Sequence, residues 1–422
     1  MSKSLPLELP QLQNWSCHTC GGCCKQHGIY ITAEERQRII DQGWTEADGI
    51  PADQPLFVEM GHLPGRKWWR LAHQPDGSCV FLDERGLCKI HGKFGEPAKP
   101  LACRIYPYAF HPAGDYLAVG LRFSCPSVVE NLGTPVVEQR SELQRLARLV
   151  VPEGARATTP PKLTDKQPLT WEQVLQLVDA FDTILAQEDH SVIAKLLQAV
   201  QLTDLLTAAK IESFAGKQFV ELLQLMLDAV ATESCDSAAP QPPRGIVGTQ
   251  FRLLAGQYAR KDTYSTQITW GSRWSMLWAG WALARGRGNT PALQARLQSV
   301  PFASLENPIG VLPVAADEML TRYLRVKVQA LHFCGAAYYG EPFIPGLHSL
   351  ALVVPVVLWI ARWLAAQEGR AAVGTKDVLE AITIADHHHG YSPALGTWTF
   401  RNRIRTLAAM KGIPRLIAWY GR

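Results

Sequence analysis

The stretch Cys17-His-Thr-Cys20-Gly-Gly-Cys23-Cys24 places four thiols within eight residues of the chain. Thiols this close cannot all pack as inert apolar side chains, because they react with one another or bind a metal. Two residues between cysteines allow both sulfurs to face one ion while backbone N–H groups stabilise the thiolates. Gly21 and Gly22 let the main chain approach such a centre closely. The spacing therefore predicts a metal-binding loop.

Four more cysteines precede residue 126, so the candidate metal ligands are Cys17, Cys20, Cys23, Cys24, Cys79, Cys88, Cys103 and Cys125. Eight soft ligands, with His91 nearby, suffice for two four-coordinate sites or for one iron–sulfur cluster beside a structural zinc. The Cys-Pro pair at Cys125 is typical of the last ligand in bacterial ferredoxins, although the ferredoxin spacing before that ligand is absent. We therefore expect an iron–sulfur cluster of the 4Fe–4S type, with zinc as the alternative.

Two further motifs follow the opening run in order. They are Cys79-Val-Phe-Leu with Gly86-Leu-Cys88-Lys-Ile, and then Pro100-Leu-Ala-Cys103-Arg104-Ile-Tyr106-Pro107. Together these motifs resemble the YkgJ-like cysteine-cluster family, a zinc- or iron-chelating domain that flagellin lysine N-methylases also carry. The resemblance covers roughly residues 15 to 130 and implies metal binding through the eight cysteines. The family often has Tyr where this chain has His91, so the resemblance does not assign His91 as a ligand.

Length and composition indicate an ordinary globular protein of two or three domains, with 422 residues and 47% hydrophobic content. The formal net charge of +4 is small for this length, so it makes nucleic acid an unexpected partner and any basic surface local. The N-terminus lacks the apolar core of a secretory signal. We therefore expect a cytoplasmic protein whose thiols bind metal and do not form disulfides.

The predicted fold class is α+β and mainly α, with a small loop-rich cysteine-cluster domain followed by a larger all-helical domain. We place the first domain at 1–150, a Pro-rich linker at 151–169, and the helical domain at 170–422 with a flexible loop at 236–247. Strands are expected at 68–71 and 116–123. Capping-box spacing at Thr32 and Thr170 predicts two helix starts. Apolar periodicity predicts further helices at about 130–150, 219–230, 248–260, 272–286, 315–338, 348–367 and 375–387.

One apolar run, from Leu350 to Ala361, must be weighed as a membrane segment. It is well short of the roughly 20 residues that a spanning helix needs, and Pro355 interrupts it. We predict a buried core helix and no membrane span.

Several other residues have both a functional and a structural interpretation. Arg104 and Tyr106 could tune a metal centre at Cys103, or Arg104 could simply compensate thiolate charge. The run His387-His388-His389 could ligate a metal, but consecutive helical residues point about 100° apart, which favours a helix-end cluster. Cys235 and Cys334 are expected to be structural, with Cys334 among apolar helix residues. The basic stretch Phe400–Arg405 with Trp398 could contact nucleic acid or an acidic partner, but a solvated helix face is commoner.

The sequence leaves open whether the chain is an enzyme. The segment from Glu318 to Leu324 is similar to the helical region of flagellin lysine N-methylases, which implies S-adenosylmethionine as cofactor and a protein substrate. A glycine-rich cofactor turn after a strand is absent from the sequence. A methylase would therefore bind S-adenosylmethionine elsewhere, between the two domains. A second alternative is a redox or metal-handling carrier without an organic cofactor.

Overall fold

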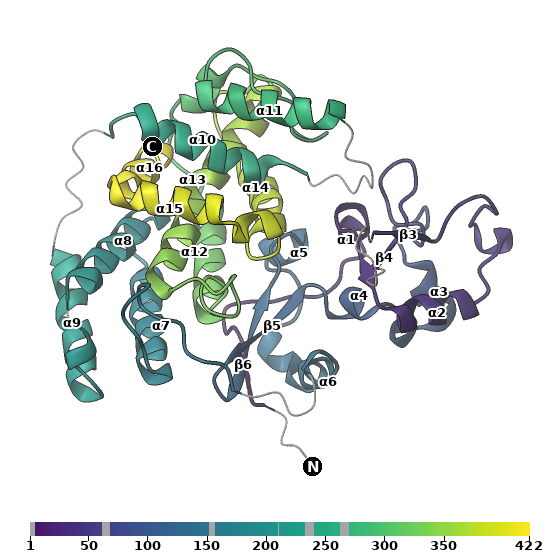
Figure 1. The fold of residues 1–422 in the computed structure, drawn as a ribbon, viewed down its shortest axis with the longest axis horizontal. Coiled ribbons are helices and arrows are strands. Elements are labelled where there is room, and N and C mark those ends of the chain that lie inside the picture. Colours follow the sequence, from purple (N-terminus) through teal and green to yellow (C-terminus); the bar gives the residue numbers. More distant parts are fainter. Residues whose placement is uncertain (1–4, 61–67, 152–156, 210, 233–239, 262–269) are drawn as a thin grey trace.

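The computed structural model describes residues 5–60, 68–151, 157–209, 211–232, 240–261 and 270–422. Figure 1 shows a small lobe of short helices and strands beside a larger body of packed helices. The predicted class, α+β and mainly α, is confirmed, because a small cysteine-bearing sheet region precedes a larger helical region. We call residues 17–105 the cysteine lobe and the remaining described residues the body.

The cysteine lobe consists of a small antiparallel sheet, short helices and the loops between them. Its sheet has the order β2-β4-β3. Thr32 begins the longest helix of the lobe with a capping box in which Glu35 is the second partner, as predicted. The strands are β2 (Tyr30–Ile31), β3 (Phe57–Glu59) and β4 (Trp69–Leu71), and the helices are α1 (Gly22–Gln26), α2 (Ala33–Asp41), α3 (Lys89–Phe94) and α4 (Leu101–Ile105). The buried apolar cluster of this lobe is small, so hydrophobic burial alone gives it little stability.

A second sheet, with the order β1-β6-β5, belongs to the body. Its strands are β1 (Leu7–Glu8), β5 (Tyr108–Ala113) and β6 (Tyr116–Leu121). β1 runs parallel to β6, with Leu7 opposite Leu117, whereas β5 and β6 form an antiparallel hairpin. From β1 in the body the chain therefore continues into the cysteine lobe and returns to the body at β5. The strand predicted at 116–123 is confirmed as far as Leu121, after which the chain turns toward Cys125.

Helices form the rest of the body. They are α5 (Pro126–Val129), α6 (Arg140–Val150), α7 (Trp171–Ala186), α8 (Val192–Ala208), α9 (Lys217–Thr232), α10 (Gly245–Ala259), α11 (Trp270–Arg285), α12 (Val314–Gln329), α13 (Phe343–Gln367), α14 (Thr375–His388), α15 (Trp398–Ala409) and α16 (Gly412–Tyr420). The capping box predicted at Thr170 begins α7.

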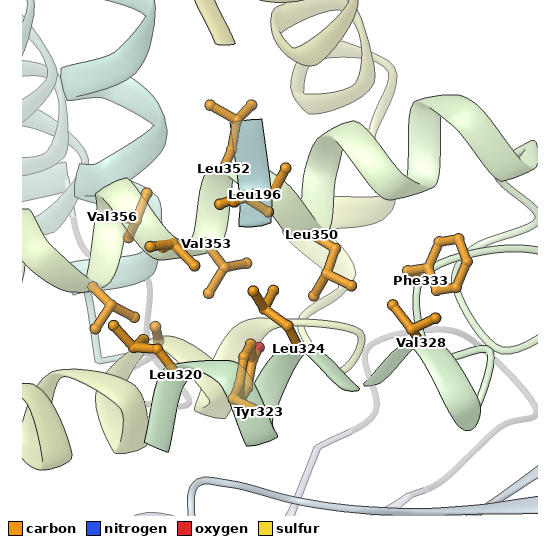
Figure 2. Close-up of a cluster of buried hydrophobic side chains, with 14 of the residues drawn as sticks. Leu196, Leu320, Tyr323, Leu324, Val328, Phe333, Leu350, Leu352, Val353 and Val356 are labelled. Carbon is orange, nitrogen blue, oxygen red and sulfur yellow. The ribbon is translucent and has the colours of Figure 1, made fainter. Parts of the chain in front are cut away.

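Helix α13 is the centre of the body. Its side chains are buried without a break from Ser349 to Ala365, against α14, α16 and α10 among others. In Figure 2, Leu350 and Val353 of α13 lie beside Leu324 of α12. Within the described residues, α13 alone has the length and hydropathy of a membrane span, but 89% of its most apolar window is buried inside the protein. The prediction of a core helix is therefore confirmed.

Some predicted boundaries are wrong for local reasons. The helix expected at 130–150 begins only at Arg140, because Asn131 and Gly133 adopt positive φ angles in the preceding turns. The helix expected at 315–338 ends at Gln329, since Leu331 has a left-handed φ of 54°. The loop expected at 236–247 ends earlier, because α10 begins at Gly245, and residues 236–239 lie outside the described residues. Among the helices of the body, α5, α8 and α16 were not predicted, whereas the stretch Phe400–Arg405, expected as a helix face, lies on α15.

The buried side chains divide the chain differently from the predicted domain boundary near residue 150. Leu143 and Leu146 of α6 share one apolar cluster with α7, and Leu163 and Leu169 from the expected linker are buried in it as well. The second cluster contains only lobe residues. The proposed domain limits therefore stay a prediction, while core packing separates the cysteine lobe from the body.

Candidate metal centre

The first four thiols lie around the start of α1. Cys17 and Cys20 are in the exposed loop before this helix, and Cys23 and Cys24 are on it. Gly21 has a φ of 67°, in the left-handed region that favours glycine. A side chain at Gly22 would contact Cys20 Sγ at 3.4 Å. The two glycines therefore let the loop fold back against the helix start, as the sequence suggests.

A turn brings the next two thiols to α1. The backbone N–H of Cys79 donates to Cys24 O at 2.8 Å, which ties the turn directly to the cysteine helix. The Asp83 carboxylate accepts hydrogen bonds from the backbone N–H groups of Arg85 and Leu87. This closed turn places Cys88 at the N-cap of α3.

The last two candidate ligands come from opposite sides of the lobe–body boundary. Cys103 lies on α4, and the backbone N–H of Leu101 fixes this helix by donating to Glu35 Oε1 at 2.7 Å. Cys125 is 8% exposed and forms the N-cap of α5 directly after the second sheet. Cys125 therefore belongs to the body, whereas the other candidates belong to the lobe.

Five thiols lie so close together that the negative charge of one thiolate disfavours ionisation of the others. Cys23 Sγ lies 3.9 Å from Cys24 Sγ, and a hydrogen bond from Cys24 lowers the pKa of Cys23 to about 6. The same bond raises the pKa of Cys24, as do burial and the charges of Cys23, Cys79 and Cys103. Burial raises the pKa of Cys79 to about 12, and the charge of Cys88 adds to it. Burial and the charges of its neighbours also raise the pKa of Cys103. A bound cation would reverse this mutual destabilisation of thiolates.

A second, smaller group surrounds Cys125. Burial raises the pKa of its thiol, and the charge of Cys20 contributes in the same direction. The structure thus places Cys20 near Cys125, whereas the five thiols of the larger group lie near one another. Cys17 is exposed in the same loop as Cys20.

Across the described ranges, no three Cys, His, Asp or Glu side chains are arranged to hold one ion. The assignment of eight cysteines as ligands therefore stays a prediction. The donor set itself fits zinc or iron, because every candidate is a thiol and nine described cysteines, Cys334 among them, are free of disulfides.

The polar neighbours of the thiols have other partners. Arg104 Nε donates to Glu96 Oε1 at 2.8 Å, so a carboxylate already balances this guanidinium. The Tyr106 hydroxyl lies 3.4 Å from Ser124 Oγ, and its ring lies 5.1 Å from that of His27. His91 lies on α3 with an exposed side chain.

The three consecutive histidines end α14, as predicted. His387 stacks on His27 with ring centroids 4.7 Å apart, His388 Nε2 lies 2.5 Å from Arg260 O, and His389 Nδ1 lies 3.0 Å from the Tyr258 hydroxyl. The three imidazoles therefore have three different partners, although the rings of His387 and His388 lie 5.1 Å apart.

Burial and ion pairs favour structural roles for the remaining candidates that the structure describes. Cys334 is buried, but it lies in a turn after α12 and not in a helix, which corrects its predicted position. Cys235 lies outside the described residues. In the basic stretch, Arg401 pairs with Glu341 and Arg405 with Asp165. These ion pairs favour the interpretation as a helix face.

A buried ion pair beside the thiols was not predicted. Lys327 Nζ lies 2.6 Å from Asp386 Oδ1, and both side chains are at most 1% exposed. The other oxygen of Asp386 accepts the backbone N–H of Ser124 at 3.0 Å, one residue before Cys125. Burial raises the pKa of the Asp386 carboxyl and lowers the pKa of the Lys327 ammonium, and each charge opposes the shift in the other. Sequence offers no signal for this pair, because its members are joined only by the packing of α12 on α14.

A basic pocket lies where α1 meets the body, and we call it the junction pocket. Its empty volume is about 320 Å³, mouth included. Its cations are Lys261, Arg260 and Arg296, and burial together with the charge of Arg296 lowers the pKa of Lys261. The lining residues are Gln26, Arg260, Lys261, Gln294, Arg296, Thr383, Ile384, His387 and His388.

These features define a cysteine-cluster domain. They are the CxxCxxCC loop, the closed turn, and the two helix N-caps that carry thiols. Residues 16–125 match the protein-family model described as "CxxCxxCC: Putative zinc- or iron-chelating domain". The resemblance to this cysteine-cluster family is therefore confirmed for that part of the chain, whereas the relation to flagellin lysine N-methylases stays a hypothesis. No curated protein and no solved structure matches the chain.

Proposed function

We propose that the cysteine lobe and Cys125 bind an iron–sulfur cluster, with zinc as the alternative metal. The single observation that supports this proposal is the convergence of Cys23, Cys24, Cys79, Cys88 and Cys103 from four separate segments of the lobe. Thiolates so close together are stable only when a cation offsets their charge. When bound, the metal supplies that charge, together with folding energy for a lobe whose apolar core is small.

The proximity of the thiols also supports two groups of ligands. The larger group consists of the five thiols named above. The smaller group consists of Cys20 and Cys125, and we assign Cys17 to it because Cys17 is in the same loop as Cys20. Because Cys125 is fixed to the body, the smaller group would join the lobe to the body when metal is bound.

The experiment is metal and acid-labile sulfide analysis of protein purified without oxygen, together with its visible absorption spectrum. About four irons and four sulfides per chain with a brown colour would support the 4Fe–4S cluster. One or two zincs in a colourless sample would support the zinc alternative. Protein without bound iron or zinc would contradict the proposal.

The variants Cys24→Ser and Cys125→Ser test the two groups separately, and Cys334→Ser is the matched control. Cys334 is as buried as Cys125 but lies in the turn after α12. We expect each of the first two variants to lose part of the metal and the control to keep all of it. Equal metal content in all three would contradict the assignment.

A second candidate function is a lysine N-methylase that uses S-adenosylmethionine and a protein substrate. The junction pocket favours it, because Lys261 and Arg296 would suit a carboxylate at the boundary between α1 and the body. A thermal-shift titration tests this function. Stabilisation by S-adenosylmethionine, reduced in Arg296→Gln, would support the methylase, and no shift at saturating cofactor would contradict it.

A carrier of electrons or metal is the third candidate. It requires reversible reduction or labile metal without an organic cofactor. A redox titration of the same oxygen-free sample would show reversible reduction, and a chelator competition would show lability. Free thiols in the described chain support placing this protein in the cytoplasm, where thiols stay reduced.

A further inference from the structure

Helix α11 presents an unusual apolar face to solvent. Trp274, Leu277, Trp278 and Trp281 are 62%, 65%, 63% and 52% exposed, and we call these four residues the tryptophan stripe. Their spacing of three and four residues puts them on one side of the helix. Large apolar side chains occur singly on most protein surfaces, so a continuous row of four marks a binding surface.

The stripe points directly away from the body. Leu283 is 4% exposed and packs on α10, where Gly256 leaves room for its side chain. Nine residues separate Leu283 from Trp274, which at about 100° per residue places them on opposite sides of the helix. The stripe therefore lies on the side of α11 opposite the contact that Leu283 makes with α10. Figure 1 shows α11 on the outside of the body.

The charge around the stripe is positive. Between Asp262 and Glu306 the sequence contains no Asp or Glu, but it contains Arg273, Arg285, Arg287 and Arg296. Arg285 is exposed at the end of α11, with Cζ 5.1 Å from the centre of the Trp281 ring. Arg287 is exposed just beyond the helix. Although the whole chain carries little net charge, the charged residues of this segment are all positive, and Arg285 and Arg287 are exposed at the end of α11 that carries Trp281.

We propose that α11 is a peripheral membrane-binding helix that lays its tryptophan stripe on an anionic lipid surface. Tryptophan favours the boundary between headgroups and acyl chains, because its ring is apolar and its N–H is polar. Arginine at the same boundary pairs with lipid phosphates while its aliphatic part stays among apolar groups. A helix with these two residue types lies in the plane of the interface and does not span it.

Charge disfavours a second copy of the chain as the occupant of the stripe. A two-fold symmetric contact would place each stripe on its symmetry mate, and this arginine-bearing segment of each copy would then meet the other without a carboxylate of its own. An anionic bilayer supplies both the apolar layer and the negative charge.

The test is co-sedimentation of the full chain with vesicles of phosphatidylglycerol and phosphatidylcholine in equal parts, and with vesicles of phosphatidylcholine alone. We expect binding to the anionic vesicles only, and weaker binding as the salt concentration rises. The double variant Trp274→Ser/Trp278→Ser should bind at least about tenfold more weakly, because two aromatic rings no longer leave water. Trp398→Ser is the matched control, because Trp398 is 75% exposed on α15.

Each other outcome overturns the proposal. These outcomes are no binding to anionic vesicles at low salt, equal binding to both kinds of vesicle, and equal loss in the control variant. A dimer of the unaltered chain that the double variant converts to monomer would show that a second copy covers the stripe. Circular dichroism and the melting temperature show whether each variant is folded, and the salt dependence of the unaltered chain tests the charge contribution without any variant.

Discussion

Replacing Asp386 with asparagine should destabilise the body strongly, although it changes only one side-chain group. The asparagine amide would keep an oxygen for the backbone N–H of Ser124, so the variant removes the negative charge opposite Lys327 and little else. The ammonium has no route to water, since its side chain is 1% exposed. It lies within 6 Å of the rings of Phe123, Tyr323 and Tyr391, whose faces only partly replace a carboxylate.

Removing one partner of a buried ion pair typically costs about 3–5 kcal/mol, because the other charge is left without compensation. We therefore expect Asp386→Asn to lower the free energy of unfolding by about 3 kcal/mol or more. The double variant Lys327→Met/Asp386→Asn should recover much of this loss, since it no longer buries an unpaired charge.

Urea unfolding followed by circular dichroism measures these differences at one fixed temperature. The matched control is Asp204→Asn, because Asp204 and Lys411 form a similar 2.8 Å pair but are 50% and 70% exposed. An exposed pair contributes about 0–1 kcal/mol. If Asp386→Asn costs no more than Asp204→Asn, the Lys327 charge must be solvated in some other way and the reasoning is wrong. Metal content gives a second readout, because Asp386 anchors the segment that ends at Cys125.

Removing metal with a chelator should make the cysteine lobe, but not the body, sensitive to limited proteolysis, because the lobe has only a small apolar core. Cleavage mapped by mass spectrometry should fall within residues 17–105, metal should restore protection, and cleavage spread over the body would contradict this view. Acid should destabilise the body, because burial lowers the pKa of His111 and His387 to about 3 and of His348 to about 4. The unfolded chain binds these protons more tightly, so stability is complete above about pH 6.5 and falls by about 1.4 kcal/mol per histidine for each pH unit below it. His348→Gln should reduce the loss between pH 7 and 5 by about 2 kcal/mol in urea unfolding, and an unchanged loss would show that His348 is protonated in the fold.

Local signals predicted the parts of the fold that depend on local chemistry. Thr32 and Thr170 begin helices in the structure because each hydroxyl accepts a backbone N–H three residues on, which the sequence spacing already indicates. The cysteine spacing likewise identified the candidate thiols. The sequence could also have revealed the stripe on α11, where tryptophans recur at helical spacing, although only the structure shows that this face is exposed.

Contacts between distant segments could not be predicted in this way. The parallel pairing of β1 with β6 joins Leu7 to Leu117, and no local pattern indicates which strand would be the partner. The same holds for Lys327 and Asp386. The end of α12 was missed for a different reason: the apolar pattern continues through Phe333, but Leu331 adopts a left-handed conformation that terminates the helix.

The parallel pairing of β1 with β6 determines how this chain can be divided. The segment recognised as a family, residues 16–125, would carry the β5–β6 hairpin away from both β1 and α12. Leu117, Val119 and Leu121, which are buried in the whole chain, would then be exposed to solvent. We therefore expect the 16–125 fragment to aggregate when it is expressed alone. A cut before β5 avoids this hazard but leaves Cys125 behind. A fragment that contains the cysteine lobe therefore loses either its solubility or the Cys125 thiol. A hybrid protein would need the cysteine lobe together with the complete β1-β6-β5 sheet.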